Sequence, residues 1–314
     1  MSHTSRPVAL VVIALLGTVL VGVGGGSATP LTTGGPPPDL GANETVVVAA
    51  DGGTGSDYRS LAAAVANASD GDTVRVRPGT YAGGVELTGN VTVVAPAGAT
   101  VSNATAGGPE NAFVVNGSHA APTVAGFTVV GFGHGLFAAE TRGDWTVRDT
   151  TFRDVGWAAV YAGQSSGDWV VTGVTVEGAS TGVWSFGATG SRRVEDTVVR
   201  NVSAGVQASD TAGNWTVADT LVHGARRTFE AGGSTGAWTL RNVTVDTDAD
   251  VEADDDEVLF TAVAARGSAG DWRILDSTFH DGIVGVSAYE TSGDWTVADT
   301  RFVNQTASER YRFW

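Results

Sequence analysis

The chain has 314 residues, 34 of them acidic and 18 basic, so its formal net charge is −16. All basic residues are arginine, and the chain contains neither lysine nor cysteine. This composition excludes disulfide bonds, cysteine zinc sites and thiolate nucleophiles, and it argues against a nucleic-acid partner, which needs a basic surface. Excess carboxylates without lysine are typical of proteins that stay soluble at high salt. We therefore expect a salt-adapted protein.

The first 42 residues are not expected to belong to the folded domain. Arg6 precedes an apolar run over residues 8–23 and then a group of small residues, which indicates a secretory signal peptide over residues 1–28. A membrane helix needs about 20 apolar residues, so membrane contact is expected only if this segment is uncleaved. Residues 29–42 are rich in proline, glycine and threonine, which is typical of a linker, and the domain spans 43–314. The protein is expected to be secreted or attached to the cell surface.

Asn-x-Ser/Thr sequons occur throughout this chain, and an exported protein is expected to be glycosylated at some of them. Nine asparagines stand in such sequons: Asn43, Asn67, Asn90, Asn103, Asn116, Asn201, Asn214, Asn242 and Asn304.

A short helix is predicted ahead of the repeated part of the chain. Asp57 can cap it, and Tyr58, Leu61 and Val65 share one face. An amphipathic helix here would cover the open N-terminal end of a repeat array. The alternation of valine and arginine over residues 73–77 predicts the first strand that follows.

From residue 122 the sequence repeats about every 23 residues. A Gly-x-Trp motif recurs, and Pro122 and Arg192 occupy the tryptophan slot in two further copies. The tryptophans are Trp145, Trp169, Trp215, Trp238, Trp272 and Trp295. Each repeat has short β-rich segments and no room for a helix. The predicted fold is all-β: a single-stranded right-handed parallel β-helix, a solenoid of about 23 residues per coil with a short N-terminal capping helix.

Several slots of the repeat have a predicted structural role. The second and seventh positions after the tryptophan slot are apolar, so both columns should stack inside the coils. The fourth position holds Asp, Asn or Gly from Asp149 to Asp299, residues that tolerate a left-handed backbone, so it should form a corner. The tryptophans should form a structural aromatic ladder.

Residues 46–96 resemble the N-terminal segment of the pectin-lyase-like β-helix superfamily, most closely that of pectin methylesterases. The resemblance rests on Asp51-Gly52, on the predicted helix at 58–67 and on Pro78-Gly79-Thr80-Tyr81. It implies a β-helix fold. The later repeats resemble those of carbohydrate-binding and sugar-hydrolase proteins, and also those of a maturation protein of the copper enzyme nitrous oxide reductase.

The catalytic motifs of these families are not matched. Pectin methylesterases act with two Asp, a Gln and an Arg, and residues 218–221 resemble the first Asp motif, but Ala218 replaces the Gln. Gly133-His134-Gly135 is similar to a polygalacturonase motif, whose paired Asp are absent here. The candidates for catalysis are Arg227, Glu230, His134 and Asp219.

A ligand is expected on the third strand of the repeat, because its residues differ from coil to coil. The fourteenth position after the tryptophan slot is apolar in every copy and should point inward, so the fifteenth should face solvent. The fifteenth column consists of Phe137, Val160, Trp184, Gln207, Glu230 and Ser287, and the twelfth consists of His134, Trp157, Thr181, Ala204, Arg227 and Val284. Aromatic faces stack on sugar rings, and polar neighbours orient the hydroxyl groups. The predicted binding residues are Phe137, Trp157, Trp184, His134, Arg227 and Glu230.

One interval between repeats contains an acidic insertion whose spacing resembles that of a calcium-binding loop. Val251 stands where such a loop needs glycine, and a solvated acidic loop is the alternative interpretation. Calcium is thus the one candidate cofactor, with the ligands Asp246, Asp248, Asp250, Glu252, Asp254 and Glu257.

These observations favour an exported, salt-adapted β-helix protein that binds a polysaccharide or cell-surface glycan without catalysis. The first alternative is a carbohydrate-active enzyme: a polysaccharide lyase, a pectinesterase-like enzyme or a glycosidase. The second is a structural envelope protein or a β-helix protein that assists metalloenzyme maturation.

Overall fold

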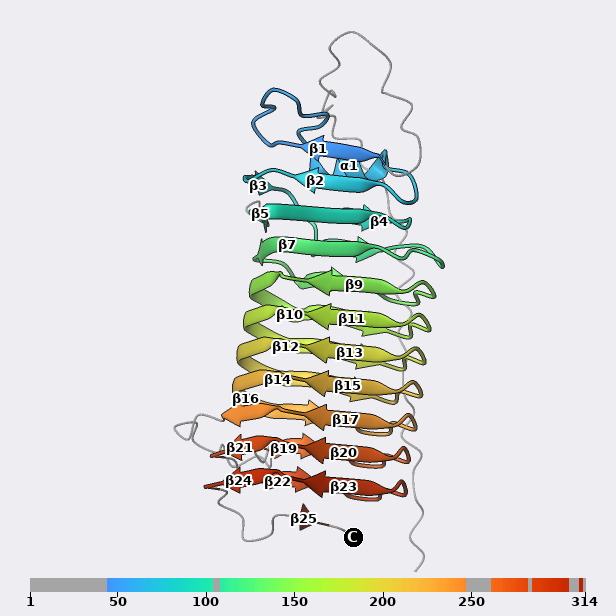
Figure 1. Ribbon diagram of the computed structural model, residues 1–314, viewed down its shortest axis with the longest axis vertical. Coiled ribbons are helices and arrows are strands. Elements are labelled where there is room, and N and C mark those ends of the chain that lie inside the picture. Colours follow the sequence, from blue (N-terminus) through green and yellow to red (C-terminus); the bar gives the residue numbers. More distant parts are fainter. Residues whose placement is uncertain (1–43, 104–107, 247–260, 282–283, 305–310, 313–314) are drawn as a thin grey trace, which may run out of the picture. The chain divides into compact units, whose positions relative to one another are not determined.

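The computed structural model describes residues 44–103, 108–246, 261–281, 284–304 and 311–312. Within these ranges the chain folds into coils whose strands pair in parallel with the next coil, which makes a parallel β-helix (Figure 1). The predicted signal peptide, the linker and Asn43 lie outside the described residues. Among the described residues, no helix is long and apolar enough to cross a membrane.

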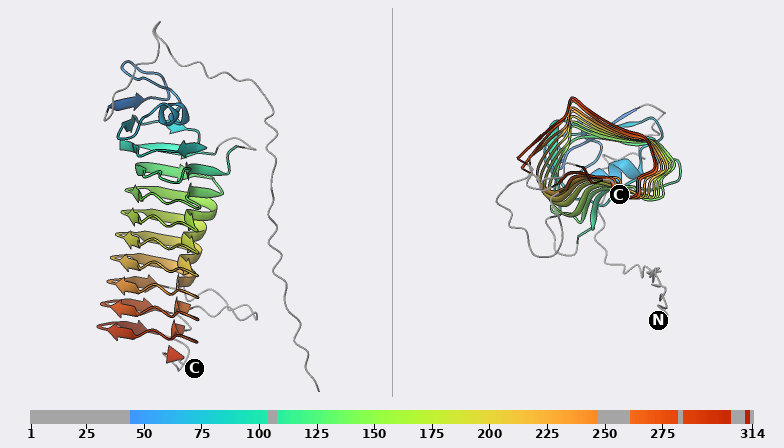
Figure 2. Two further views of the ribbon diagram at one scale, coloured as in Figure 1. Left: turned by 90° about the vertical axis from the view of Figure 1, so that its right-hand side faces the viewer. Right: turned by 90° about the horizontal axis from the view of Figure 1, so that it is seen from below.

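Each full coil contributes to three ladders of parallel strands, and the coils superimpose when viewed along the stack (Figure 2). The first ladder consists of β1 (Thr45–Val48), β2 (Thr73–Val76), β5 (Thr92–Ser102), β7 (Thr123–Val130), β9 (Trp145–Arg148), β11 (Trp169–Thr172), β13 (Arg192–Glu195), β15 (Trp215–Ala218), β17 (Trp238–Arg241), β20 (Trp272–Leu275) and β23 (Trp295–Ala298).

The other two ladders share the long strands of the central coils. The second consists of β3 (Thr80–Tyr81), the later parts of β5 and β7, then β10 (Thr151–Gly163), β12 (Thr175–Phe186), β14 (Val198–Ser209), β16 (Leu221–Glu230), β18 (Thr244–Asp246), β21 (Thr278–His280) and β24 (Arg301–Val303). The third consists of β4 (Val85–Leu87), β6 (Asn111–Val115), β8 (His134–Phe137), the later parts of β10, β12, β14 and β16, then β19 (Thr261–Ala264), β22 (Val284–Ser287) and β25 (Tyr311–Arg312).

The predicted inward columns fill the coils. The column two residues after the tryptophan slot is buried from Val147 to Ile274, and its members pair in register between successive coils. In the last described coil, Val297 and Phe302 are only partly buried. Phe302 still stacks on Phe279 at 5.1 Å between ring centroids.

The predicted corner is confirmed, because every residue four positions after the tryptophan slot has a left-handed backbone, with φ between 48° and 61° from Asp149 to Asp299. Two further columns of this kind were not predicted. They include Asp154 and Asn201 in one column and Gln164 and Asp210 in the other, with φ between 50° and 54°. Asp, Asn and Gly tolerate this conformation, so the corners explain why these residue types recur.

Some sequons arise from this corner chemistry. Asn201, Asn242 and Asn304 all occupy left-handed corners. The Asn242 amide donates to Oδ1 of Asp219 at 2.6 Å, and the Asn304 amide donates to Oδ1 of Asp281 at 3.0 Å. The coil geometry therefore gives a structural reason for asparagine at these three positions, and glycosylation of the sequons stays a prediction.

The tryptophan ladder is structural, as predicted. From Trp145 to Trp272 the rings are 0–4% exposed, and neighbouring rings such as Trp238 and Trp272 stack at 5.0 Å with an interplanar angle of 4°. From the Trp145 slot onward, the residue two positions before the slot is glycine, because the chain of the preceding coil approaches closely there. A Cβ atom at Gly213 would lie 2.0 Å from the carbonyl oxygen of Gly190 in the preceding coil.

Helix α1 (Leu61–Ala66) lies at the N-terminal end of the stack, and its buried residues Leu61, Ala64 and Val65 join the core (Figure 1). The predicted cap, Asp57, placed the start of this helix too early. The N-cap is Ser60, whose Oγ accepts a hydrogen bond from the Ala63 amide. The carboxylate of Asp57 instead accepts a hydrogen bond from the Val47 backbone amide at 2.8 Å, and this bond stabilises the turn that follows β1.

Candidate functional site

The strand register brings a column of large side chains to the outer side of the third ladder. Pairing aligns Phe137 with Tyr161, Tyr161 with Trp184, Trp184 with Gln207 and Gln207 with Glu230. We call the surface formed by this column, together with His134, Trp157, Phe186 and Arg227, the third-ladder face. All five column residues are partly exposed.

The alignment made from the sequence was wrong in one coil. Val160 belongs to the inward column and is fully buried, and Tyr161 takes the outward position. The coil that starts at Trp145 has one extra residue, and the register between β10 and β12 shifts between Val155 and Ala158. For the same reason Ala158, and not Trp157, pairs with His134.

The aromatic side chains of the face touch one another across three coils. The rings of Phe137 and Tyr161 stack at 5.1 Å, and Tyr161 meets Trp184 edge-on at 5.2 Å. His134 packs against this group, with its ring centroid 5.2 Å from Phe137 and 5.6 Å from Tyr161. Trp157 lies nearly parallel to the His134 ring at 6.5 Å.

Two aromatic rings of the face are strongly exposed. Trp157 is 60% exposed and Phe186 is 40% exposed. Phe186 was missed, although strand alternation contains its signal: Trp184 points outward, Ser185 is buried, and Phe186 points outward again. Tyr161 was missed because spacing alone does not show where a 24-residue coil takes up its extra residue.

Polar groups continue the column where the aromatic rings end. The Gln207 amide donates to Oε2 of Glu230 at 2.7 Å, and Nη1 of Arg227 lies 3.5 Å from the same oxygen. The structure thus brings together Arg227 and Glu230, two of the predicted site residues. This network presents donors and acceptors beside the aromatic surface.

His134 is held in one orientation. Its Nδ1 lies 3.0 Å from Oδ1 of Asn111. Burial lowers the pKa of His134, and the nearby Glu110 carboxylate opposes this shift only in part. The imidazole is therefore neutral near pH 7, and when Nδ1 donates to Asn111, Nε2 is an acceptor.

Asp219 does not join this site. It occupies the corner after β15 with φ 50°, where its carboxylate accepts from Asn242 and lies 3.6 Å from Nη2 of Arg241. Glu230 stands at the end of β16, beyond the next corner of the same coil. The carboxylate of Asp219 therefore serves the coil turn.

The predicted calcium ligands lie mostly outside the described residues, which include only Asp246 of the six. Its Oδ2 lies 3.2 Å from Nδ1 of His223. Across the part of the chain that the structure describes, no group of three or more His, Asp or Glu side chains is arranged to hold a metal ion.

No family model matches this sequence, and no curated protein matches it. Solved structures do share the architecture. A pectate lyase, Pel9A, aligns with 83% of this chain and 79% of its own, at 14% identity and a TM-score of 0.55. The fold is the right-handed parallel β-helix.

Two other solved structures align less well with this β-helix. The family 28 exopolygalacturonase of Yersinia enterocolitica aligns over 86% of this chain and 77% of its own, at 11% identity and a TM-score of 0.47. The pectin methylesterase of Aspergillus niger covers 85% of this chain and 89% of its own, at 12% identity and a TM-score of 0.33. At 14% identity, the similarity to the pectate lyase establishes the fold alone.

Proposed function

We propose that this protein is an exported, salt-adapted β-helix protein that binds a polysaccharide or cell-surface glycan on its third-ladder face, without chemistry of its own. The observation that carries the proposal is the run of touching, partly exposed rings of Phe137, Tyr161 and Trp184, flanked by Trp157. Aromatic faces of this kind match the apolar faces of sugar rings.

The dimensions of the third-ladder face suit a chain-like ligand. Neighbouring strands lie about 4.8 Å apart, so the five coils from Phe137 to Glu230 span about 19 Å. Along that distance the surface changes from aromatic to polar, ending at Gln207, Glu230 and Arg227. A sugar chain lying along the β-helix would find stacking partners and hydrogen-bond partners in succession. The fold shared with a pectate lyase is in keeping with such a ligand.

Binding without catalysis is favoured by the positions of the carboxylates. Glycosidases of the common two-carboxylate type need two such groups flanking one bond. Here Glu230 is paired with Arg227 and Gln207, and Asp219 is committed to a coil corner. The sequence, moreover, does not match the catalytic motifs of pectin methylesterases or polygalacturonases.

The test is a glycan array run beside a release assay on uronate and neutral polysaccharides, both in molar salt. Binding without release of products supports the proposal. Product release would instead favour a carbohydrate-active enzyme, and Arg227→Ala and Glu230→Gln would then be assayed first. If the protein neither binds nor cleaves any polysaccharide, the proposed function is wrong.

Salt adaptation has its own test. At a net charge of −16 the excess carboxylates repel one another, and dissolved ions screen that repulsion. The stability of the folded protein should therefore rise with ionic strength. A melting temperature that is equal in millimolar and molar salt would contradict salt adaptation. It would not bear on the proposal that the third-ladder face binds a glycan.

A further inference from the structure

The charged groups of the third-ladder face bear on the kind of glycan that it can hold. The face includes one arginine, Arg227, and Nη1 of this residue lies 3.5 Å from Oε2 of Glu230. The same oxygen accepts a hydrogen bond from the Gln207 amide at 2.7 Å. A ligand carboxylate would have to displace Glu230 before it could pair with Arg227, so this cation is already compensated.

The aromatic end of the face has an exposed carboxylate beside it, that of Glu110. The backbone oxygen of Glu110 accepts hydrogen bonds from the amides of Gly133 and His134 at 2.8 and 3.2 Å. A Cβ atom built on Gly133 would lie 2.9 Å from Cγ of Glu110 and 3.4 Å from Cδ1 of Trp157, so these two side chains are neighbours. Among the described residues, no arginine or histidine lies within ion-pair distance of the Glu110 carboxylate.

Two further arginines near the face do not compensate this end of it. Arg153 lies on the second ladder, where its Nε is 3.4 Å from Oε2 of Glu177. Arg226 is exposed, but it belongs to the coil that starts at Trp215, three coils from the coil of Trp157. At about 4.8 Å between neighbouring strands, three coils span about 14 Å.

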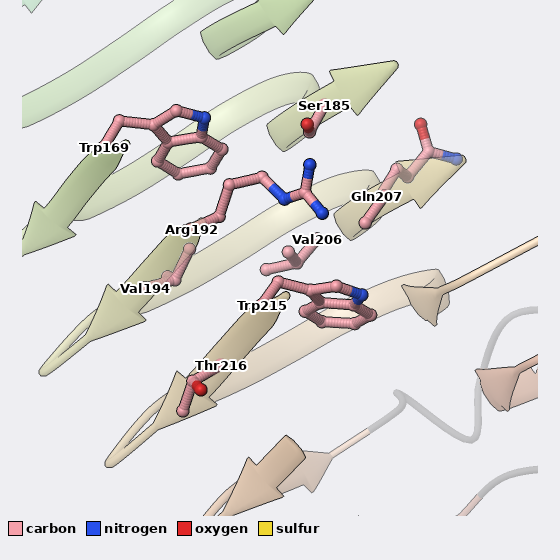
Figure 3. Close-up of a pocket in the computed structure, with 9 residues that line it drawn as sticks. Trp169, Ser185, Arg192, Val194, Val206, Gln207, Trp215 and Thr216 are labelled. Atoms are coloured by element: carbon pink, nitrogen blue, oxygen red, sulfur yellow. The ribbon is translucent and has the colours of Figure 1, made fainter. Parts of the chain in front are cut away.

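A third cation, Arg192, is closed to surface ligands. It is 4% exposed, and its guanidinium group lies between the rings of Trp169 and Trp215 in the interior of the coils (Figure 3). Nη1 donates to the carbonyl oxygen of Ala188 at 3.1 Å, and Nη2 donates to that of Gly213. The charge of Arg192 therefore cannot pair with a sugar that lies on the outer face.

An acidic sugar would be disfavoured at the aromatic end for two reasons. Its carboxylate or sulfate group would lose water without gaining a cation, and the Glu110 carboxylate would repel it. An uncharged sugar has hydroxyl groups that can donate to Glu110 in charge-assisted hydrogen bonds, and to Nε2 of the neutral His134. The same side chains thus oppose one class of sugar and hold the other.

We infer that the third-ladder face selects uncharged polysaccharides and rejects uronates and sulfated glycans, and that Glu110 determines this specificity. The inference rests on the proposed function, because it requires that a glycan lies on this face. A polyuronate carries a carboxylate on every sugar, and about four sugars fit along the 19 Å or so of the face. Arg226, at one end, can meet only one of these charges.

The first experiment is a glycan array in molar sodium chloride. It carries β-1,4-glucan, β-1,3-glucan, amylose and galactan, each beside its counterpart oxidised at C6 to the uronate, together with natural uronate and sulfated polysaccharides. At this salt concentration the Debye length is about 3 Å, so the net charge of −16 is largely screened and selection by the face itself remains. The protein should bind uncharged probes, and each bound probe should bind at least about 10-fold more weakly after oxidation.

The array separates the two levels of the account. Acidic probes that bind as well as uncharged ones would overturn this inference and leave the proposed function standing. Binding to no probe of any kind would overturn the proposed function, and the inference with it.

The second experiment tests Glu110 itself through the substitution Glu110→Gln, which removes the charge and keeps the shape. The C6-oxidised form of a bound probe is titrated as a competitor of the uncharged form. Without the like charge of Glu110, the competitor concentration needed for half displacement should fall about 2- to 5-fold.

Glu290→Gln is the matched control for this substitution. Glu290 is exposed at a left-handed corner where another coil has Gln164, so glutamine fits that backbone. Its coil lies seven strand pairings from that of Glu110, about 34 Å along the stack. The control should compete like the unaltered protein. If Glu110→Gln also competes like the unaltered protein, Glu110 does not determine the specificity and the inference is wrong.

Discussion

Two runs of aromatic side chains follow the same β-helix, and they differ in what surrounds them. In the tryptophan ladder the rings from Trp145 to Trp272 are 0–4% exposed and face the core. On the third-ladder face, Phe137, Tyr161 and Trp184 are partly exposed, and Trp157 is 60% exposed. The first run recurs in nearly every coil, whereas the second is confined to three successive coils. Residues that repeat in every coil serve the stacking of the coils, whereas the residues that vary from coil to coil form the surface that we propose for glycan binding.

The largest expected effect separates the two runs by stability. Trp238 packs between Trp215 and Trp272, so Trp238→Ala should lower the free energy of unfolding by about 3–5 kcal/mol. Trp184→Ala removes a ring from the outer face and should cost about 1 kcal/mol or less. Urea denaturation of both variants measures the difference. Equal losses would show that Trp184 is a packing residue and that the binding face is misplaced.

The repeated glycine can be tested in the same way. Gly213→Ala would force a Cβ atom against the Gly190 carbonyl and should destabilise the protein by about 1–3 kcal/mol through overpacking. Gly156→Ala is the matched control, because its Cβ would lie 3.8 Å from the nearest oxygen, that of Phe132. A stable Gly213→Ala variant would mean that the coils can separate locally at no cost.

Substitutions at two neighbouring residues should have opposite effects, one on stability and the other on glycan binding. Val183→Ala leaves a void in the core and should cost about 1–3 kcal/mol while glycan affinity stays unchanged. Trp184→Ala should instead weaken glycan binding about 2- to 12-fold, the value of one aromatic stacking contact. Isothermal titration together with thermal melting gives both quantities. Weaker binding by Val183→Ala alone would point to a site other than the third-ladder face.

The smallest expected effect concerns pH. Burial holds the pKa of His134 below its usual value near 6.5, so the unfolded chain takes up a proton more readily than the folded one. Stability from this group is complete above about pH 6.5 and is lost as the pH falls through the lowered pKa. His134→Gln should flatten that part of the pH–stability profile. If the variant and the original protein have parallel profiles, His134 is not desolvated by Phe137 and Tyr161.

The fold was predictable because its causes repeat. Valine at one slot, Asp or Asn at the left-handed corner and tryptophan in the ladder recur at fixed spacing, and each has one physical reason. The site was only partly predictable, because it depends on departures from the repeat. The extra residue near Trp157 moved Tyr161 onto the face, and no spacing rule states where such a residue is accommodated. Likewise, the sequence placed Arg192 in the tryptophan slot, but only the structure shows that this arginine is 4% exposed.

The central claim is that the third-ladder face holds the glycan, and hydroxyl-radical footprinting tests it most directly. The protein is oxidised with and without a saturating polysaccharide found on the array, and mass spectrometry measures the modification of each aromatic residue. Trp295, which is 45% exposed on the last coil of the first ladder, is the internal control. We predict that the polysaccharide protects Trp157, Tyr161 and Trp184 and leaves Trp295 as reactive as before. Unchanged reactivity at Trp157 and Trp184 under saturating ligand would contradict the account.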